Sequence, residues 1–164
     1  MADLERWLAE LQSPVLAKRA EAAESLCTLG PDAQPAAVGL VRAAADEDET
    51  VSAWVNEALE NLGPPPVEAQ PELVALLIHE SSTVNYWATT LLGRLGPAAS
   101  ESQYALAELL NSSASLAARE RAAWALKKVE GSSDEAIAAL NNAASQDQPR
   151  LSRLAQEALA ALAG

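Results

Sequence analysis

One short phrase recurs five times along the chain: ESLCTLGP (residues 24–31), EALENLGPP (57–65), TLLGRLGP (90–97), WALKKVEG (124–131) and EALAALAG (157–164). The first leucine that the copies share lies at Leu26, Leu59, Leu92, Leu126 and Leu159, so the spacing is 33 or 34 residues. A self-similar period of about 20 to 50 residues is typical of a solenoid. We therefore predict five repeats, over 1–30, 31–63, 64–96, 97–130 and 131–164, within a single domain of 164 residues.

Each phrase has the features of a helix end. A glycine that tolerates a left-handed conformation is followed by a proline that cannot continue an α-helix, at residues 30–31, 63–64 and 96–97. The start of the same helix is marked by Pro14 or Pro149 at the first helical position, or by Ser82 or Ser115 as a cap. These signals predict a second helix in each repeat, helix B, over 14–29, 50–62, 83–95, 116–129 and 149–162.

A first helix, helix A, is predicted before each helix B. One large apolar position recurs in it, at Trp7, Leu40, Leu73, Leu106 and Leu140, and we expect these side chains in the core. Two of these helices have the residues of a capping box, Ser100 with Gln103 and Ser132 with Glu135. The fold class is therefore all-α, with roughly three quarters of the residues helical.

The helix B sequences LAKRAEAAESLCTLG (16–30), TVSAWVNEALENLG (50–63) and TVNYWATTLLGRLG (83–96) resemble the HEAT-repeat consensus. That consensus has an apolar residue and an arginine, then small residues, then a Leu-Gly-x-Leu-Gly ending. The period is shorter than the usual ~40 to 47 residues, so the chain is similar to the short bacterial HEAT-like class. The resemblance implies a right-handed α-solenoid, a superhelix of about five helix pairs with helix B on the concave face.

The consensus arginine shows where the chain departs from that pattern. It is present as Arg19 and Arg119, and it is replaced by Ser52, Asn85 and Ser152 in the other repeats.

Composition argues against several classes of partner and compartment. The formal net charge is −12, which disfavours binding to nucleic acid or to an anionic membrane surface. Acidic residues are concentrated in the second repeat, at −6, whereas the fourth repeat is neutral. The single Cys27 allows no internal disulfide, and no signal peptide or stretch of ~18 apolar residues is present. We therefore expect an acidic, cytoplasmic protein.

The residues needed for common catalytic and metal sites are scarce. Cys27 and His79 are the only residues of their kinds, which argues against a catalytic triad or a His/Cys zinc site. No glycine-rich phosphate loop is present. The acidic run Asp46–Glu49 lacks the spacing of a calcium loop and is expected to form a solvated turn facing a helix N-terminus. We predict no catalytic residue, no metal and no cofactor.

Residue phase on helix B separates a core side from an opposite, exposed side. Tyr86, Trp124 and Lys127 fall on the exposed side, with several glutamates. Trp54 and Trp87 share a flanking position, where packing between repeats is the alternative to binding. The residues expected to contact a partner are Trp54, Tyr86, Trp87, Arg94, Arg121, Trp124, Lys127 and Lys128.

These features predict a non-catalytic scaffold that binds a protein or peptide segment on the concave helix B face of the third and fourth repeats. The oligomeric state stays open, with a monomer as the simpler expectation. Two other functions remain as alternatives. One is an enzyme or enzyme subunit, since short HEAT-like repeats resemble bilin chromophore lyases and one class of alkylpurine DNA glycosylases; the second of these conflicts with the acidic charge. The other is a structural spacer.

Overall fold

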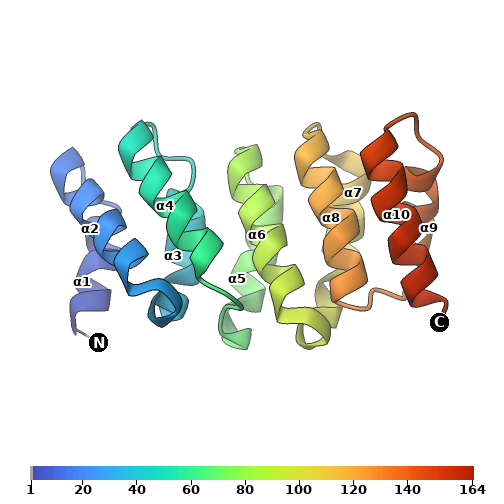
Figure 1. Ribbon diagram of the computed structural model, residues 1–164, viewed down its shortest axis with the longest axis horizontal. Coiled ribbons are helices and arrows are strands. Elements are labelled where there is room, and N and C mark those ends of the chain that lie inside the picture. The colour runs from blue at the N-terminus through green and yellow to red at the C-terminus, as the bar shows by residue number, and fades with distance from the viewer. Residues whose placement is uncertain (1) are drawn as a thin grey trace. The chain divides into compact units, whose positions relative to one another are not determined.

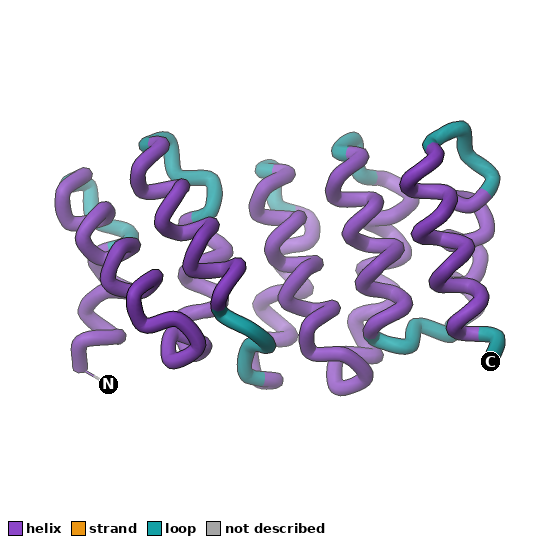
Figure 2. The backbone as a smooth tube through the Cα atoms, in the orientation of Figure 1, coloured by secondary structure: helices purple, strands orange, loops and turns teal. Residues whose placement is uncertain are grey.

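The computed structural model describes residues 2–164, and all of the regular structure in this part of the chain is helical. α-Helices and 3-10 helices together make up 80% of the chain, which confirms the all-α prediction. Figure 2 shows the helices joined by short loops. None of the helices in the described part is both long enough and apolar enough to cross a membrane.

The contacts divide the chain into two compact units, one that ends at Ala69 and one that spans Gln70–Gly164. The single domain of five repeats stays a prediction. The elements of the first unit are α1 (Ala2–Glu10), α2 (Leu16–Leu29), η1 (Gly30–Ala36), α3 (Ala37–Ala43), α4 (Glu49–Asn61) and η2 (Val67–Ala69). In this unit α2 packs against α4, and Figure 1 shows α1 and α3 behind that pair.

The second unit contains three helix pairs. Its elements are α5 (Gln70–Ala75), η3 (Leu76–Ile78), α6 (Ser82–Leu95), η4 (Gly96–Ser102), α7 (Gln103–Ser112), α8 (Leu116–Lys128), α9 (Asp134–Ala144) and α10 (Pro149–Leu162). Here α8 packs between α6 and α10, and α5, α7 and α9 form a second layer behind them (Figure 1). The helices α2, α4, α6, α8 and α10 are the five helix B segments, and each boundary lies within two residues of its predicted position.

The starts of these helices were predicted less well. α10 begins at Pro149, and the Ser115 hydroxyl caps α8 by accepting from the amide of Ala118, as predicted. The prediction for Pro14 was wrong, because α2 begins only at Leu16. Ser82 was also wrong as a cap, since it lies inside α6.

Neither predicted capping box forms. Ser100 lies within η4, and the α7 helix that follows begins at Gln103. The side chain of Gln103 instead accepts a hydrogen bond from the amide of Ser133 at 2.8 Å. Ser133 itself caps α9, by accepting from the amide of Ala136, so the cap lies one residue beyond the predicted Ser132.

The glycines that end the phrases have the predicted positive φ: 55° at Gly30, 74° at Gly63 and 62° at Gly96. The prolines after Gly30 and Gly96 do not end the helical path, however. The chain continues as η1 and η4, because a proline near the start of a helix lacks only an amide that would have no partner there. In the fourth repeat, Glu130 takes the positive φ, at 57°.

The core consists of the leucines that the repeat predicts. Leu26, Leu59, Leu92 and Leu126 are fully buried, as are the helix A residues Leu40, Leu73, Leu106 and Leu140. Trp7 was also expected in the core and is only half-buried. The Arg6 guanidinium lies over its ring at 5.8 Å, so an exposed cation covers part of this side chain.

The position of the consensus arginine has the same role in all five repeats. Its side chain donates to a backbone carbonyl within three residues of the end of helix A in the same repeat. The pairs are Arg19 with Ser13 at 3.0 Å, Ser52 with Ala44 at 3.2 Å, Asn85 with Leu77 at 3.0 Å, Arg119 with Leu110 at 3.0 Å and Ser152 with Ala144 at 2.6 Å. The substitutions therefore change the residue and keep the hydrogen bond, which satisfies a carbonyl that the end of a helix leaves without a partner.

The two arginines at this position also reach the following repeat. Arg19 Nε lies 2.8 Å from Asp46 Oδ2, and Arg119 donates to the side-chain oxygen of Gln146. The hydrogen bond to Asp46 raises the pKa of Arg19. Asp48, in the same acidic run, caps α4 by accepting from the amides of Thr50 and Val51. The run therefore forms a helix-capping turn, with Asp46 paired rather than solvated.

Candidate functional site

Charge is strongly segregated within the second unit. All seven of its Lys and Arg residues lie on α6, α8 and α10, with only Glu120 and Glu157 beside them, so these three helices have a net charge of +5. The remainder of the unit contains eight carboxylates and no Lys or Arg. The chain therefore has a positively charged layer of helices although its total charge is −12. We call the helices α6, α8 and α10 the basic layer.

At the centre of the basic layer, one arginine lies between two aromatic rings. The Arg121 guanidinium carbon is 4.7 Å from the centre of the Tyr86 ring and 4.9 Å from that of Trp124. Arg121 also donates a hydrogen bond to the Tyr86 hydroxyl. A planar cation is attracted to the faces of aromatic rings, and this stack therefore holds the guanidinium in a fixed orientation.

The position of Trp124 depends on a glycine in the neighbouring repeat. A Cβ atom at Gly93, on α6, would overlap the Trp124 ring, so only glycine allows the indole to lie this close to α6. Lys128 Nζ lies 6.0 Å from the centre of the same ring. Tyr86 and Trp124 are both half-buried, so each supports the helix packing and still presents surface to solvent.

Next to this stack lies a cavity of about 270 Å³ between the three helices of the basic layer, which we call the arginine pocket. It is lined by Tyr86, Ala117, Glu120, Arg121, Trp124, Arg150 and Leu154. Glu120 Oε2 lies 3.3 Å from Arg150 Nε, where the glutamate side chain is 13% exposed and the arginine 68%. The arginine pocket thus combines two guanidinium groups with apolar walls.

A second cavity, the lysine pocket, lies where α8 and α10 end. It measures about 460 Å³ and is lined by Lys127, Lys128, Glu130, Ser132, Ala161 and Leu162. Both lysines are exposed. The two pockets therefore follow one another along the same pair of helices.

Two of the tryptophans expected to bind a partner lie elsewhere. Trp87 is only 6% exposed and packs in the core, with its ring edge-on to Tyr86 at 5.5 Å and under Arg94 at 5.9 Å. Its burial leaves little surface for a partner, so this expectation is corrected to a supporting role. Trp54 is half-buried on α4, which belongs to the first unit, and it lines a cavity with Glu49 and Glu57.

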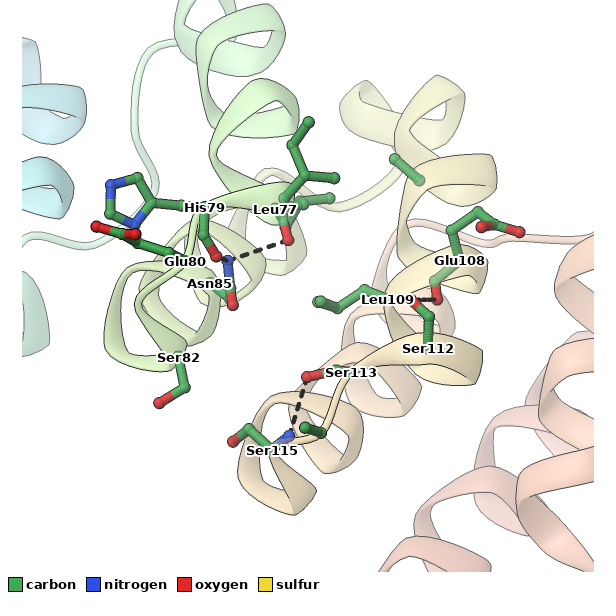
Figure 3. A pocket seen from close by; sticks show the side chains of 13 residues that line it. Leu77, His79, Glu80, Ser82, Asn85, Glu108, Leu109, Ser112, Ser113 and Ser115 are labelled. Atoms are coloured by element: carbon green, nitrogen blue, oxygen red, sulfur yellow. Dashed lines mark hydrogen bonds between the residues drawn. The ribbon is translucent and has the colours of Figure 1, made fainter.

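Another cavity, of about 530 Å³, was not predicted from the sequence. Figure 3 shows it between the turn before α6 and the turn before α8, with His79 and Glu80 on the opposite side from Glu108. Its Asn85 amide donates to the carbonyls of Leu77 and His79 at 3.0 and 2.9 Å. These polar groups hold the turn together. Ile78, which also lines this cavity, is 91% exposed, and no pattern in the sequence indicated that exposure.

The remaining candidates for chemistry are the Cys27 thiol and the side chains that could bind a metal ion. Burial, with a smaller contribution from Glu57, raises the pKa of the Cys27 thiol, so the thiol is less ionised than usual. Among the described residues, no three His, Cys, Asp or Glu side chains are grouped so that they could hold a metal ion.

Comparison with known proteins agrees with this architecture. A family described as HEAT repeats matches residues 69–160. No curated protein matches the chain. Among solved structures, an engineered protein is 25% identical, with a TM-score of 0.63, and the match covers 99% of this chain and 80% of the other.

Two designed proteins are also similar. A designed armadillo repeat protein in complex with the peptide (KR)4 is 21% identical, with a TM-score of 0.64 and coverage of 95% and 80%. Computationally designed armadillo repeat proteins for modular peptide recognition give 19% identity, a TM-score of 0.63 and coverage of 96% and 81%. These likenesses confirm the α-solenoid fold.

Proposed function

The chain belongs to the HEAT-repeat family, and we propose that it is a non-catalytic scaffold whose basic layer binds a protein or peptide segment. The observation that supports this most directly is the Tyr86–Arg121–Trp124 stack beside a cavity. Aromatic and arginine side chains dominate the binding energy of protein interfaces. A guanidinium that is already held in place loses less conformational entropy when it binds a partner.

Charge indicates the chemistry of the segment. The basic layer has a net charge of +5, whereas α2 and α4 of the first unit hold two cations and five carboxylates. An acidic segment is therefore attracted to the basic layer and repelled by the rest of the chain. The designed armadillo protein is bound to a basic peptide, (KR)4, and we expect the opposite preference here.

The size of the arginine pocket favours a side chain as its occupant. At about 270 Å³ it lies below the ~300 to 1,000 Å³ typical of small-molecule sites, and a bilin is larger than most such ligands. This disfavours the lyase alternative at this site. An absorbance shift on mixing the protein with a bilin would reverse that conclusion.

The test is selection of binders from a displayed library of random linear peptides, followed by affinity measurements with the selected peptides. Trp124→Ala should weaken binding by about 30-fold, the equivalent of ~2 kcal/mol for a hot-spot residue. Tyr104→Ala is the matched control, because Tyr104 is 55% exposed on α7, outside the basic layer. Circular dichroism must show that both variants remain folded.

Two results would reject the proposal. One is that no peptide is selected. The other is that the selected peptides bind the Tyr86→Ala, Trp124→Ala double variant with unchanged affinity.

A further inference from the structure

The two pockets of the basic layer lie along one line. On α8 and α10 the arginine pocket is lined by Ala117, Glu120, Arg121, Trp124, Arg150 and Leu154, and Tyr86 of α6 closes its other side. The lysine pocket is lined by Lys127 and Lys128 of α8, the turn residues Glu130 and Ser132, and the end of α10. Since α8 packs against α10, the pockets occupy two stations of the groove between the same two helices. Figure 1 shows these helices side by side and pointing in the same direction.

The separation of the stations follows from helix geometry. Arg121 and Lys128 are seven residues apart on α8, and a rise of about 1.5 Å per residue places their Cα atoms ~10 Å apart along the axis. Each station presents cations: Arg121 and Arg150 at the first, Lys127 and Lys128 at the second. A ligand that uses both stations therefore needs two anionic groups ~10 Å apart on one face.

The backbone conformation of the ligand decides which residues meet this requirement. In a β-strand, side chains share a face at every second residue, which gives separations near ~7 or ~13 Å. In a polyproline II helix every third residue shares a face, and the rise of about 3.1 Å per residue gives ~9 Å. An α-helix also places residues i and i+7 on one face at ~10 Å, but a helix bound in a groove relies on a row of apolar anchors, whereas both stations here present cations.

We propose that the α8–α10 groove binds an extended, proline-containing segment with two carboxylate side chains three residues apart, one in the arginine pocket and one in the lysine pocket. This inference rests on the proposed function and specifies the ligand of the same surface. The first carboxylate is bound by Arg121 and Arg150 and displaces Glu120 from its ion pair with Arg150. The apolar stem of that residue packs against Leu154 and Trp124.

The two glutamates in the groove act against this ligand and sharpen its specificity. Glu120 keeps Arg150 paired while the pocket is empty, and Glu130 lies in the lysine pocket. A segment with a single carboxylate therefore gains little binding free energy, because its one contact with Arg150 only replaces the ion pair between Glu120 and Arg150. A segment with two correctly spaced carboxylates gains from both stations at once.

The experiment uses fluorescence anisotropy with dye-labelled synthetic peptides and the full chain. The peptides have two aspartates separated by one, two, three or six residues, proline-rich for the shorter spacings and helix-forming for the longest. A peptide with asparagine in place of both aspartates controls for charge. We expect the peptide with two intervening residues, Asp-Pro-Pro-Asp, to bind about fivefold or more tightly than the others, as charge-assisted contacts at both stations require.

Protein variants assign the two stations. Arg150→Ala and the Lys127→Ala, Lys128→Ala pair should each weaken Asp-Pro-Pro-Asp by about threefold or more. Arg153→Ala is the matched control, because Arg153 is an exposed arginine on α10 that lines neither pocket. Its affinity should change by less than about twofold.

The possible outcomes separate this inference from the proposed function. Equal affinity at all spacings, or an equal loss with Arg153→Ala, overturns the inference and indicates diffuse charge attraction. The tightest binding by the helix-forming peptide also overturns it. Competition by a single-stranded oligonucleotide as effective as that by the peptide identifies a general polyanion surface, which overturns it as well. If library-selected peptides bind but none of the aspartate pairs does, the inference fails and the proposed function stands.

Discussion

At the residue scale, two positions have an unusual property: Glu130 in its backbone conformation and Cys27 in the pKa of its thiol. Glu130 has a φ of 57°, where the equivalent residues of the first three repeats are glycines with φ between 55° and 74°. Cys27 is a half-buried thiol beside a carboxylate. Each difference has a measurable consequence, one in stability and one in reactivity.

Replacing Glu130 with glycine should stabilise the protein. A side chain with a Cβ is strained at positive φ by ~1 to 2 kcal/mol, and glycine removes this strain at the cost of a more flexible unfolded chain. We expect Glu130→Gly to raise the free energy of unfolding by ~0.5 to 1 kcal/mol in urea denaturation. Glu130→Ala removes the charge and keeps the Cβ, so it should have little effect. A larger gain from alanine would show that charge, and not backbone strain, is responsible.

The Cys27 thiol should react slowly with alkylating agents. Burial and, to a smaller degree, Glu57 raise its pKa, so less thiolate is present near neutral pH and alkylation is slower than for an ordinary thiol. The rate should still rise with pH beyond the ordinary value of about 8.5. Glu57→Gln lowers this pKa and should increase the iodoacetamide rate at neutral pH. Glu49→Gln, on the same helix, is the control, and equal rates for the two variants would contradict the role of Glu57.

At the element scale, the repeat signals located helices better than they located caps. The helix B boundaries were predicted within two residues because the leucine periodicity runs through all five repeats, and a Gly-Pro pair also marks the end of helix B in the first three. Caps were less predictable, since serines are adjacent at 81–82, 112–113 and 132–133 and the sequence does not say which one has the extended backbone. A choice of one serine over its neighbour depends on packing that a local pattern does not contain.

The hydrogen bond at the consensus arginine position also belongs to this scale. Asn85 is the most buried case, at 7% exposed, and its amide donates to the carbonyls of Leu76, Leu77 and His79. Asn85→Ser should cost ~1 kcal/mol, because Ser52 and Ser152 maintain one such bond with a hydroxyl. Asn85→Asp should cost ~3 kcal/mol or more at neutral pH, since a buried carboxylate would face only acceptors.

The stability of Asn85→Asp at acidic pH tests whether the buried charge causes the loss. Burial raises the pKa of the introduced carboxyl group above its value in the unfolded chain. The loss of stability in Asn85→Asp is therefore complete above the folded pKa, and it declines as the group is protonated at lower pH. Thermal unfolding across pH, compared with the wild type and with Asn85→Ser, measures it. A penalty for Asn85→Asp that is independent of pH would argue against the hydrogen-bond account.

At the scale of the whole molecule, part of the candidate site could be predicted from the sequence and part could not. Helical phase predicted Tyr86 and Trp124 on the exposed side of helix B, and both are half-buried, because they also pack against Arg121 in the stack. It did not predict that Arg121, 35 residues from Tyr86, lies between the two rings, because that contact depends on how α6 and α8 pack. It also did not predict the division at Ala69, although Pro64, Pro65 and Pro66 interrupt the chain just before it.

The proposal that a chain with a net charge of −12 binds an acidic segment also belongs to this scale. Coulomb interactions between exposed charges decay over about 8 to 10 Å at moderate salt, so we expect a peptide at the surface of the basic layer to interact mainly with that layer's local charge of +5. Reversal of Lys127 and Lys128 to glutamate should therefore reduce the association rate of an acidic peptide by about tenfold at low salt and flatten its salt dependence, with a smaller effect on dissociation. Stopped-flow measurements over a range of salt concentrations test this. Reversal of Lys18 on α2 and Arg42 on α3 to glutamate gives the same change in total charge outside the basic layer. If that control slows association equally, the total charge governs encounter and the basic layer has no special part in it.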